Sequence, residues 1–369
     1  MIKSKTKWII LGIILLFLIG FIYSNYNASK KEEVIKIGSI MPLTGSIAGQ
    51  GKWSVDAINL AVDEINSKGG INGRKIEIIS EDSKGLAADG LSAYEKLKNI
   101  NNVKYVLTST SSVAMAVKEP AEKDKIIVMD TTATTPMYSS PNDFSFRTGI
   151  TADGLSKKSA EILFNELNAT KVAMLIINND FGKGMEDSFK KYYSGEIVDI
   201  EHFNRDTQDV RTELLKLKNK NFDYVFLVCQ YKEGIIIINQ AKELGLNLKF
   251  FSNSYSIEVN DFLNGTGGVS EGIIYVSPTF NSENFSKAYR EKYNYEPNFY
   301  GAQAYDGIIA LSKVLEKCDY SNTECSRQEL MKLDYQGVSG IIKFDINGDV
   351  DKEVDLKTIK NGEFVKYEK

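Results

Sequence analysis

The sequence has few of the residue types that build metal and nucleic-acid sites. Among 369 residues there are three cysteines and one histidine, His202. A zinc-type site needs several such ligands close together, so His202 is interpreted as an ordinary surface or edge residue. The net charge of −4 also lacks the basic excess of nucleic-acid-binding proteins. The composition therefore predicts no metal and no nucleic-acid partner.

Several enzyme and cofactor motifs are missing as well. No G-x-S-x-G elbow is present to carry a nucleophile. There is no G-x-x-x-x-G-K-[ST] loop, and no strand is followed by G-x-G-x-x-G, so no nucleotide cradle is indicated. Asp345–Asp351 has oxygen ligands at alternating positions, but its glycine, Gly348, is in the fourth position, and Leu356 replaces the calcium-loop glutamate. A turn between strands is favoured there. The sequence predicts neither an enzyme nor a cofactor.

An uncharged, strongly apolar segment, Trp8–Ser29, follows Lys3, Lys5 and Lys7. It is long enough to span a bilayer, and the lysines should stay on the cytoplasmic side. The alternative is a cleaved signal peptide, but Tyr26 puts a bulky residue at the −3 position of the candidate cleavage site. We expect residues 1–29 to form an uncleaved anchor in the cell membrane, with the rest of the chain outside the cytoplasm.

From Val34 onward, buried strands alternate with amphipathic helices. Val34–Ile40 is apolar and β-branched, and the next helix repeats Ile58, Ala61, Val62 and Ile65 on one face. The same rhythm continues almost to the C-terminus. It predicts an α/β fold of two doubly wound domains with mostly parallel sheets, where ligands bind at the carboxyl ends of strands.

Two hydroxyl-rich, uncharged loops follow consecutive strands of the first domain. They are Thr108–Ser112 and Thr131–Thr135. Hydroxyls and backbone N–H groups at helix N-termini suit a carboxylate or similar anion. Either loop alone reads as ordinary helix capping. Their pairing at neighbouring strand ends favours a ligand site.

These segments carry a family resemblance. The order IG…PLTG…AINLAVDEINSKGGINGRK, followed by YVLTSTSSVAMA, DTTATTP, NNDFGKGM, VCQYKEG and FYGAQAYDG, resembles the branched-chain amino-acid-binding proteins. That resemblance implies a type I periplasmic-binding-protein fold with a three-crossing hinge. It further implies a first lobe of residues 34–149 plus 278–339 and a second lobe of 150–277 plus 340–369. The third crossing is expected near Val338–Ile341.

The resemblance also assigns roles by position. Ser112, with its neighbour Ser111, would bind the ligand carboxylate, and Thr134 would offer its hydroxyl and Thr132 its backbone. In the second lobe, aromatic residues would cover the ligand. These are Phe181 and Tyr231, with Tyr300 near the far end of the pocket. For each aromatic, plain packing is the alternative reading, and Tyr255 is interpreted as packing.

Two positions depart from the family. Ser254 stands where amino-acid-binding members have an acidic residue for the ligand ammonium, and Gln50 replaces an aromatic wall. Glu258 is close in sequence but out of register. A buried ammonium without a carboxylate partner is costly. The ligand is therefore either a non-amino carboxylate or an amino acid held by hydroxyls and carbonyls.

The cysteines follow from the expected location. Cys318 and Cys325 bracket a short polar loop that is expected to follow a helix, and outside the cytoplasm they are expected to form a disulfide, with two free thiols on a surface loop as the alternative. Cys229 ends an apolar strand and is expected to be a buried thiol.

The sequence thus predicts the solute-binding component of an ABC importer, with a permease and ATPases as partners and an amino acid or small carboxylate as ligand. One alternative is a ligand-sensing ectodomain that signals through a partner receptor. The other is an anchored extracellular α/β enzyme, for which no nucleophile–base pair is visible.

Overall fold

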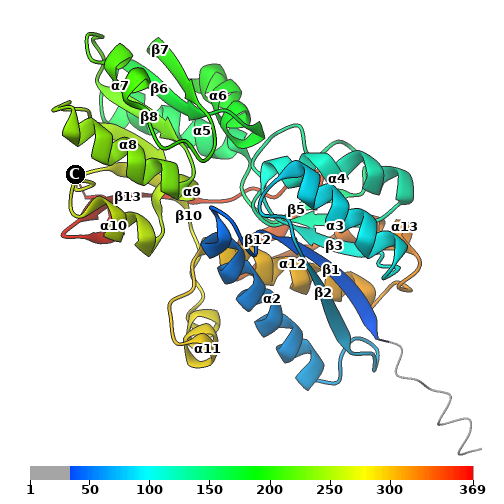
Figure 1. Cartoon of the computed structure of the whole chain (residues 1–369). Coiled ribbons are helices and arrows are strands. Elements are labelled where there is room, and N and C mark those ends of the chain that lie inside the picture. The colour runs from blue at the N-terminus through cyan, green and yellow to red at the C-terminus, as the bar shows by residue number, and fades with distance from the viewer. Residues whose placement is uncertain (1–33, 369) are drawn as a thin grey trace, which may run out of the picture.

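The computed structural model describes residues 34–368, which form two α/β lobes (Figure 1). The expected anchor over residues 1–29 lies outside the described residues. Within 34–368, no helix has both the length and the apolar character needed to cross a membrane. The predicted fold class, two mostly parallel sheets each covered by helices, is confirmed for this part of the chain.

The first lobe is built on a fully parallel sheet of five strands. Alternating side chains of its strands face opposite helical layers, as the pleat requires. Ile37 packs toward α2 and α12, whereas Ile40 packs toward α3 and α4. In spatial order the strands are β2 (Ile76–Asp82), β1 (Ile35–Met41), β3 (Tyr105–Thr108), β4 (Ile127–Asp130) and β5 (Ser145–Arg147). The helices are α2 (Ala48–Ser67), α3 (Ala87–Asn99), α4 (Ser111–Asp124), α12 (Phe299–Leu315) and α13 (Thr323–Leu330).

The second lobe has a seven-stranded sheet in which the five strands β6 to β10 run parallel and β13 and β14 are antiparallel. In spatial order the strands are β14 (Glu363–Lys366), β13 (Val354–Lys360), β10 (Ile274–Pro278), β9 (Phe250–Asn253), β8 (Tyr224–Val228), β6 (Lys171–Ile177) and β7 (Glu196–Phe203). Its helices are α5 (Ala152–Glu161), the short π-helical turn η1 (Ile162–Glu166), α6 (Asp180–Tyr192), α7 (Arg211–Leu217), α8 (Tyr231–Glu243), α9 (Ser254–Ile257) and α10 (Asn260–Thr266).

Three segments cross between the lobes. The first joins β5 to α5, and the second joins β10 to α11 (Glu283–Tyr293), which packs against α2 of the first lobe. The third crossing differs from the predicted position. The hairpin β11 (Asp334–Gly337) and β12 (Gly340–Lys343) precedes Phe344 and Val350, which are buried in the first-lobe core. First-lobe packing therefore continues through Val350, and the chain crosses at residues 351–353 instead of near 338–341.

The cysteines are distributed as follows. Cys318, just after α12, is bonded to Cys325 in α13, with the two Cα atoms 5.9 Å apart. Cys325 lies in a helix, whereas the sequence analysis placed it at the end of a loop. Cys229 follows β8 as a buried free thiol, and burial raises its pKa well above the ordinary value.

Candidate functional site

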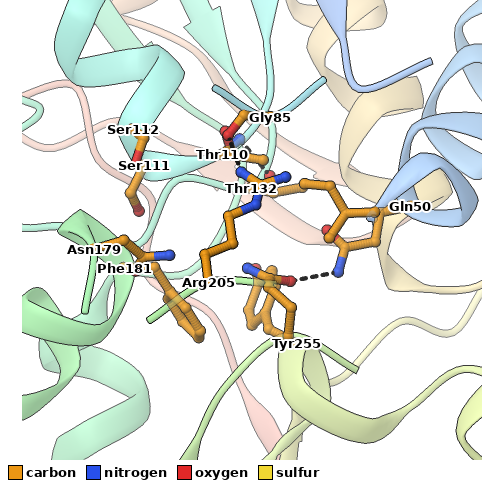
Figure 2. Close-up of a pocket in the computed structure, with 12 residues that line it drawn as sticks. Gln50, Gly85, Thr110, Ser111, Ser112, Thr132, Asn179, Phe181, Arg205 and Tyr255 are labelled. Carbon is orange, nitrogen blue, oxygen red and sulfur yellow. Dashed lines mark hydrogen bonds between the residues drawn. The ribbon is translucent and has the colours of Figure 1, made fainter. Parts of the chain in front are cut away.

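A small cavity lies between the lobes, at the carboxyl ends of strands from both sheets (Figure 2). Open α/β sheets bind their ligands at this edge. The cavity leaves about 20 Å³ for the centres of water-sized spheres, which is room for one or two waters. The described conformation is therefore closed. The 12 lining residues are Ile47, Gln50, Gly85, Thr110, Ser111, Ser112, Thr132, Asn179, Phe181, Arg205, Gln230 and Tyr255.

The first-lobe wall centres on the N-terminus of α4. Thr110 precedes this helix with φ of 80°, a conformation rare for a β-branched residue, and its buried hydroxyl has no partner among the described residues. No side chain caps the helix. Ser111 Oγ accepts weak hydrogen bonds from the N–H groups of Thr134 (3.2 Å) and Thr135 (3.3 Å), so its own O–H is free to donate into the cavity. The wall therefore presents hydroxyl donors and the positive end of a helix dipole.

Buried charges shape the loop after β4. Asp130 accepts from Thr108 Oγ1 at 2.7 Å and from the N–H of Thr132 at 2.7 Å. Burial raises the pKa of Asp130, and these hydrogen bonds act in the opposite direction. Arg147, fully buried at the end of β5, donates to the Ala133 carbonyl at 3.0 Å and pairs with Asp349 at 2.6 Å. The conformation of the 131–135 loop is thus held by internal contacts.

The second-lobe wall begins with α6. Asn179 caps this helix, with its Oδ1 accepting from the N–H of Gly182 at 2.9 Å. Its Nδ2 therefore points away from the helix, toward the cavity (Figure 2). Gly182 lies so close to β6 that a Cβ would be 1.8 Å from the Ile177 carbonyl oxygen. Phe181 is buried and lies 6.2 Å from the Tyr255 ring, centroid to centroid.

Two side chains bridge the lobes across the cavity. Gln50, in the first turn of α2, donates from Nε2 to Gln230 Oε1 at 2.7 Å. Arg205, just after β7, donates to the Lys84 carbonyl at 2.8 Å, to Ser46 Oγ at 3.1 Å, and also to the Gly85 carbonyl. These hydrogen bonds, called the bridges below, join the second lobe to residues 46–85 of the first lobe.

The Arg205 loop is itself supported by a buried acid. Glu233, in the first turn of α8, accepts from the N–H of Asp206 at 2.8 Å. Burial raises the pKa of Glu233. This hydrogen bond fixes the backbone next to Arg205 and so directs its guanidinium across the cleft.

Of the residues singled out from the sequence, Gln50, Ser111, Ser112, Thr132 and Phe181 line the cavity together. The other four, Thr134, Tyr231, Ser254 and Tyr300, are buried but are not among the lining residues.

Thr134 and Ser254 each bury a hydroxyl that has no partner among the described residues. Tyr231 is buried at the start of α8. Tyr300 lies edge-on to Tyr255 at 5.6 Å and so supports a ring that the sequence analysis treated as packing only. Glu258 is directed elsewhere, because it pairs with Lys357 at 2.5 Å.

Sequence reasoning missed Asn179, Arg205 and Gln230. Each one is the second residue after the carboxyl end of a strand: β6, β7 and β8, respectively. The strand-end rule that identified the first-lobe loops would have found all three if it had been applied to the second lobe.

Among residues 34–368, no group of three or more His, Cys, Asp or Glu side chains is arranged to hold a metal. The Asp345–Asp351 segment is a tight turn. Asp345 accepts from the N–H groups of Asn347 (2.8 Å) and Asp349 (3.0 Å). Phe344 and Val350 form an isolated antiparallel β-bridge. The Asp345 oxygens are thus used within the turn, and Asp349 binds Arg147 and Ser139.

Two α/β lobes joined by three crossings, with a polar cavity at facing strand ends, define a two-lobed solute-binding protein. The chain belongs to the periplasmic binding protein family, whose profile matches residues 34–362. It is a non-enzymatic, extracytoplasmic substrate-binding protein of the ABC-transporter type.

Relatives support this assignment over nearly the whole chain. A leucine-, isoleucine-, valine-, threonine- and alanine-binding protein of Pseudomonas aeruginosa is 24% identical, covering 92% of this chain and 91% of the relative. The isoleucine complex of LivJ from Streptococcus pneumoniae is 28% identical with a TM-score of 0.82, covering 90% and 98% of the two chains. A solute-binding protein of Rhodopseudomonas palustris in complex with 3,4-dihydroxybenzoic acid shares the fold at 22% identity and a TM-score of 0.79, covering 90% and 95%.

Proposed function

We propose that this protein captures an amino acid or a related small carboxylate in the cleft between its lobes and delivers it to an ABC permease. The single observation that carries the proposal is the uncapped N-terminus of α4, where Ser111 and Ser112 face the cavity. Helix N-termini with nearby hydroxyls bind anions. The named ligands of the S. pneumoniae and R. palustris proteins, isoleucine and 3,4-dihydroxybenzoic acid, share a carboxylate.

Closure would couple binding to delivery. The first lobe supplies the anion site, and the second lobe supplies Phe181, Asn179 and Arg205 from strand ends across the cleft. A ligand that touches both walls binds the closed form better than the open form and shifts the equilibrium toward it. Because the described cavity is close to water-sized, Gln50 and Gln230 must part to admit a ligand.

The test is binding by the purified full-length chain, screened by calorimetry against amino acids and small carboxylates. With an identified ligand, the double change Ser111→Ala and Ser112→Ala should weaken affinity at least about tenfold, because each lost hydrogen bond to a charged group contributes about 1.5–3 kcal/mol. Ser92→Ala, on the exposed face of α3, is the matched control. Unchanged affinity in the double variant would refute the site.

We further propose that residues 1–29 keep the protein at the membrane. Mass spectrometry of the membrane-associated protein should then recover peptides from Trp8–Ser29. A mature chain that begins after Ala28 would show a cleaved signal peptide instead.

A further inference from the structure

The charge of the cavity narrows the ligand class. Among the lining residues only Arg205 carries a formal charge, and it is positive. Its side chain is 18% exposed, and its Nε is buried without a hydrogen-bond partner among the described residues. Two of its five N–H donors are thus left after the three hydrogen bonds to Gly85, Ser46 and Lys84.

The nearest carboxylates do not supply a negative charge to the cavity. Asp206 forms a long ion pair with Arg205 Nε at 3.6 Å, but the Asp206 side chain is 60% exposed, so water screens the pair, and Asp206 is not part of the lining. Glu233 accepts a hydrogen bond from the Asp206 N–H, and Glu258 forms an ion pair with Lys357. Asp130 is fully buried beneath the 131–135 loop, which its oxygens hold.

Several hydrogen-bond acceptors that line the cavity already accept from donors within the protein. Asn179 Oδ1 accepts from Gly182, Gln230 Oε1 accepts from Gln50, and the Gly85 carbonyl accepts from Arg205. The acceptors that remain are neutral hydroxyl, amide and backbone oxygens. Donors, in contrast, are plentiful: the Arg205 guanidinium, Asn179 Nδ2 and the hydroxyls at the start of α4 (Figure 2).

This balance disfavours a ligand ammonium. An ammonium group that enters a closed cleft loses its hydration. Because no carboxylate from residues 34–368 lines this cavity, no ion pair compensates for that loss. A carboxylate gains the guanidinium, the strongest type of charge-assisted hydrogen-bond partner.

We infer that the cleft takes a small organic anion without an ammonium group, with Arg205 as its counter-charge. Chemical classes that meet this charge requirement are 2-oxo acids, dicarboxylates and aromatic carboxylates. This inference rests on the proposed function, since it assumes that the interlobe cleft is the ligand site.

Matched pairs of ligands test the inference on the full-length chain by calorimetry. The pairs are L-leucine with 4-methyl-2-oxopentanoate, L-glutamate with 2-oxoglutarate, and L-phenylalanine with 3-phenylpropanoate. Within the pair that binds, the member without nitrogen should bind at least about tenfold more tightly. An amino acid that binds as tightly as its partner, or more tightly, would overturn the inference while leaving the proposed function intact. No binding in any pair would count against the proposed function itself and so remove the ground for this inference.

Variants of Arg205 give a second, independent readout. Arg205→Gln should lower affinity for the anion at least about thirtyfold, and Arg205→Lys, which retains the charge, should lose less. The control is Arg211→Gln, because Arg211 lies outside the cavity and pairs with Asp209 and Glu243 on the surface. Arg205→Gln with unchanged or increased affinity would show that the guanidinium serves only to join the lobes.

Discussion

Lys352 is a buried lysine in the third crossing between the lobes. It is 8% exposed and donates to the carbonyl and Oγ of Ser339, each at 2.9 Å. Ser339 Oγ in turn donates to Asp306, so a hydroxyl links the two charges. Burial lowers the pKa of Lys352 from 10.5 to about 8, and the charge of Asp306 acts in the opposite direction. The crossing therefore carries a charge that its surroundings disfavour.

This shift predicts a pH dependence of stability. Between pH 8 and 10.5 the unfolded lysine keeps its proton while the folded one has lost it. The free energy of unfolding should therefore rise with pH across this window, by about 3 kcal/mol at most, because one pKa unit corresponds to about 1.4 kcal/mol. Below pH 8 both states are protonated and the full cost of burial is present.

Urea denaturation of wild type and Lys352→Met at pH 7.5 to 10.5 measures this rise as the difference between the two curves. The variant should lack it, whereas Lys332→Met, at an exposed site, should retain it. Parallel curves for wild type and Lys352→Met would contradict the prediction.

At the scale of elements, the start of α2 depends on a close approach to the loop before it. A Cβ on Gly51 would lie 2.0 Å from the Pro42 carbonyl oxygen. Gly49, two residues earlier in the same helix, has ordinary contact distances instead: 3.6 Å to Trp53 and 3.8 Å to the Tyr231 hydroxyl. Backbone cannot yield as a flexible side chain can, so the two glycines should respond oppositely to substitution.

Gly51→Ala should lower the free energy of unfolding by about 3 kcal/mol, as severe overpacking does. Gly49→Ala should leave it unchanged or raise it by up to about 1 kcal/mol, since alanine favours helix over glycine. Thermal and urea denaturation of both variants provide the measurement. Equal effects would mean that α2 can shift away from Pro42.

The elements themselves were largely predictable, and the reasons are physical. Strands such as β1 and β6 are buried on both faces, so their apolar runs are visible in the sequence. The β11–β12 hairpin was harder to place, because its residues are mostly exposed or half-buried and carry no sign of the lobe they join. The burial of Ile342, Phe344 and Val350 in the first-lobe core assigns that segment to the first lobe.

Residues of the candidate site were predictable where the local sequence resembles the family's segments, and less predictable elsewhere. Ser111, Ser112 and Thr132 sit in hydroxyl-rich loops that the sequence displays directly. Arg205 gave no such signal: it is one polar residue in a polar loop after β7. Its importance comes from reaching Lys84 and Gly85 on the other lobe, a long-range contact that local pattern does not encode.

At the scale of the whole molecule, the same side chains line the cavity and hold the lobes together. Four hydrogen bonds join Gln230 and Arg205 of the second lobe to the first lobe. Gln50 donates to Gln230, and Arg205 donates to Ser46, Lys84 and Gly85. A ligand anion would compete for part of this set and replace it with contacts to itself. Affinity and closure are therefore coupled, and weakening the bridges should favour the open form.

The double variant Arg205→Gln and Gln230→Ala tests this coupling in the ligand-free, full-length chain. If the bridges together stabilise closure by about 2 kcal/mol net, their loss should shift the ratio of closed to open molecules about thirtyfold. Small-angle scattering should then show a larger radius of gyration than for wild type. The control, Arg211→Gln with Gln328→Ala, removes the same residue types from exposed sites on α7 and α13 and should scatter like wild type. Identical scattering from all three proteins would mean that closure is held by other interlobe contacts, and that Arg205 and Gln230 act on the ligand alone.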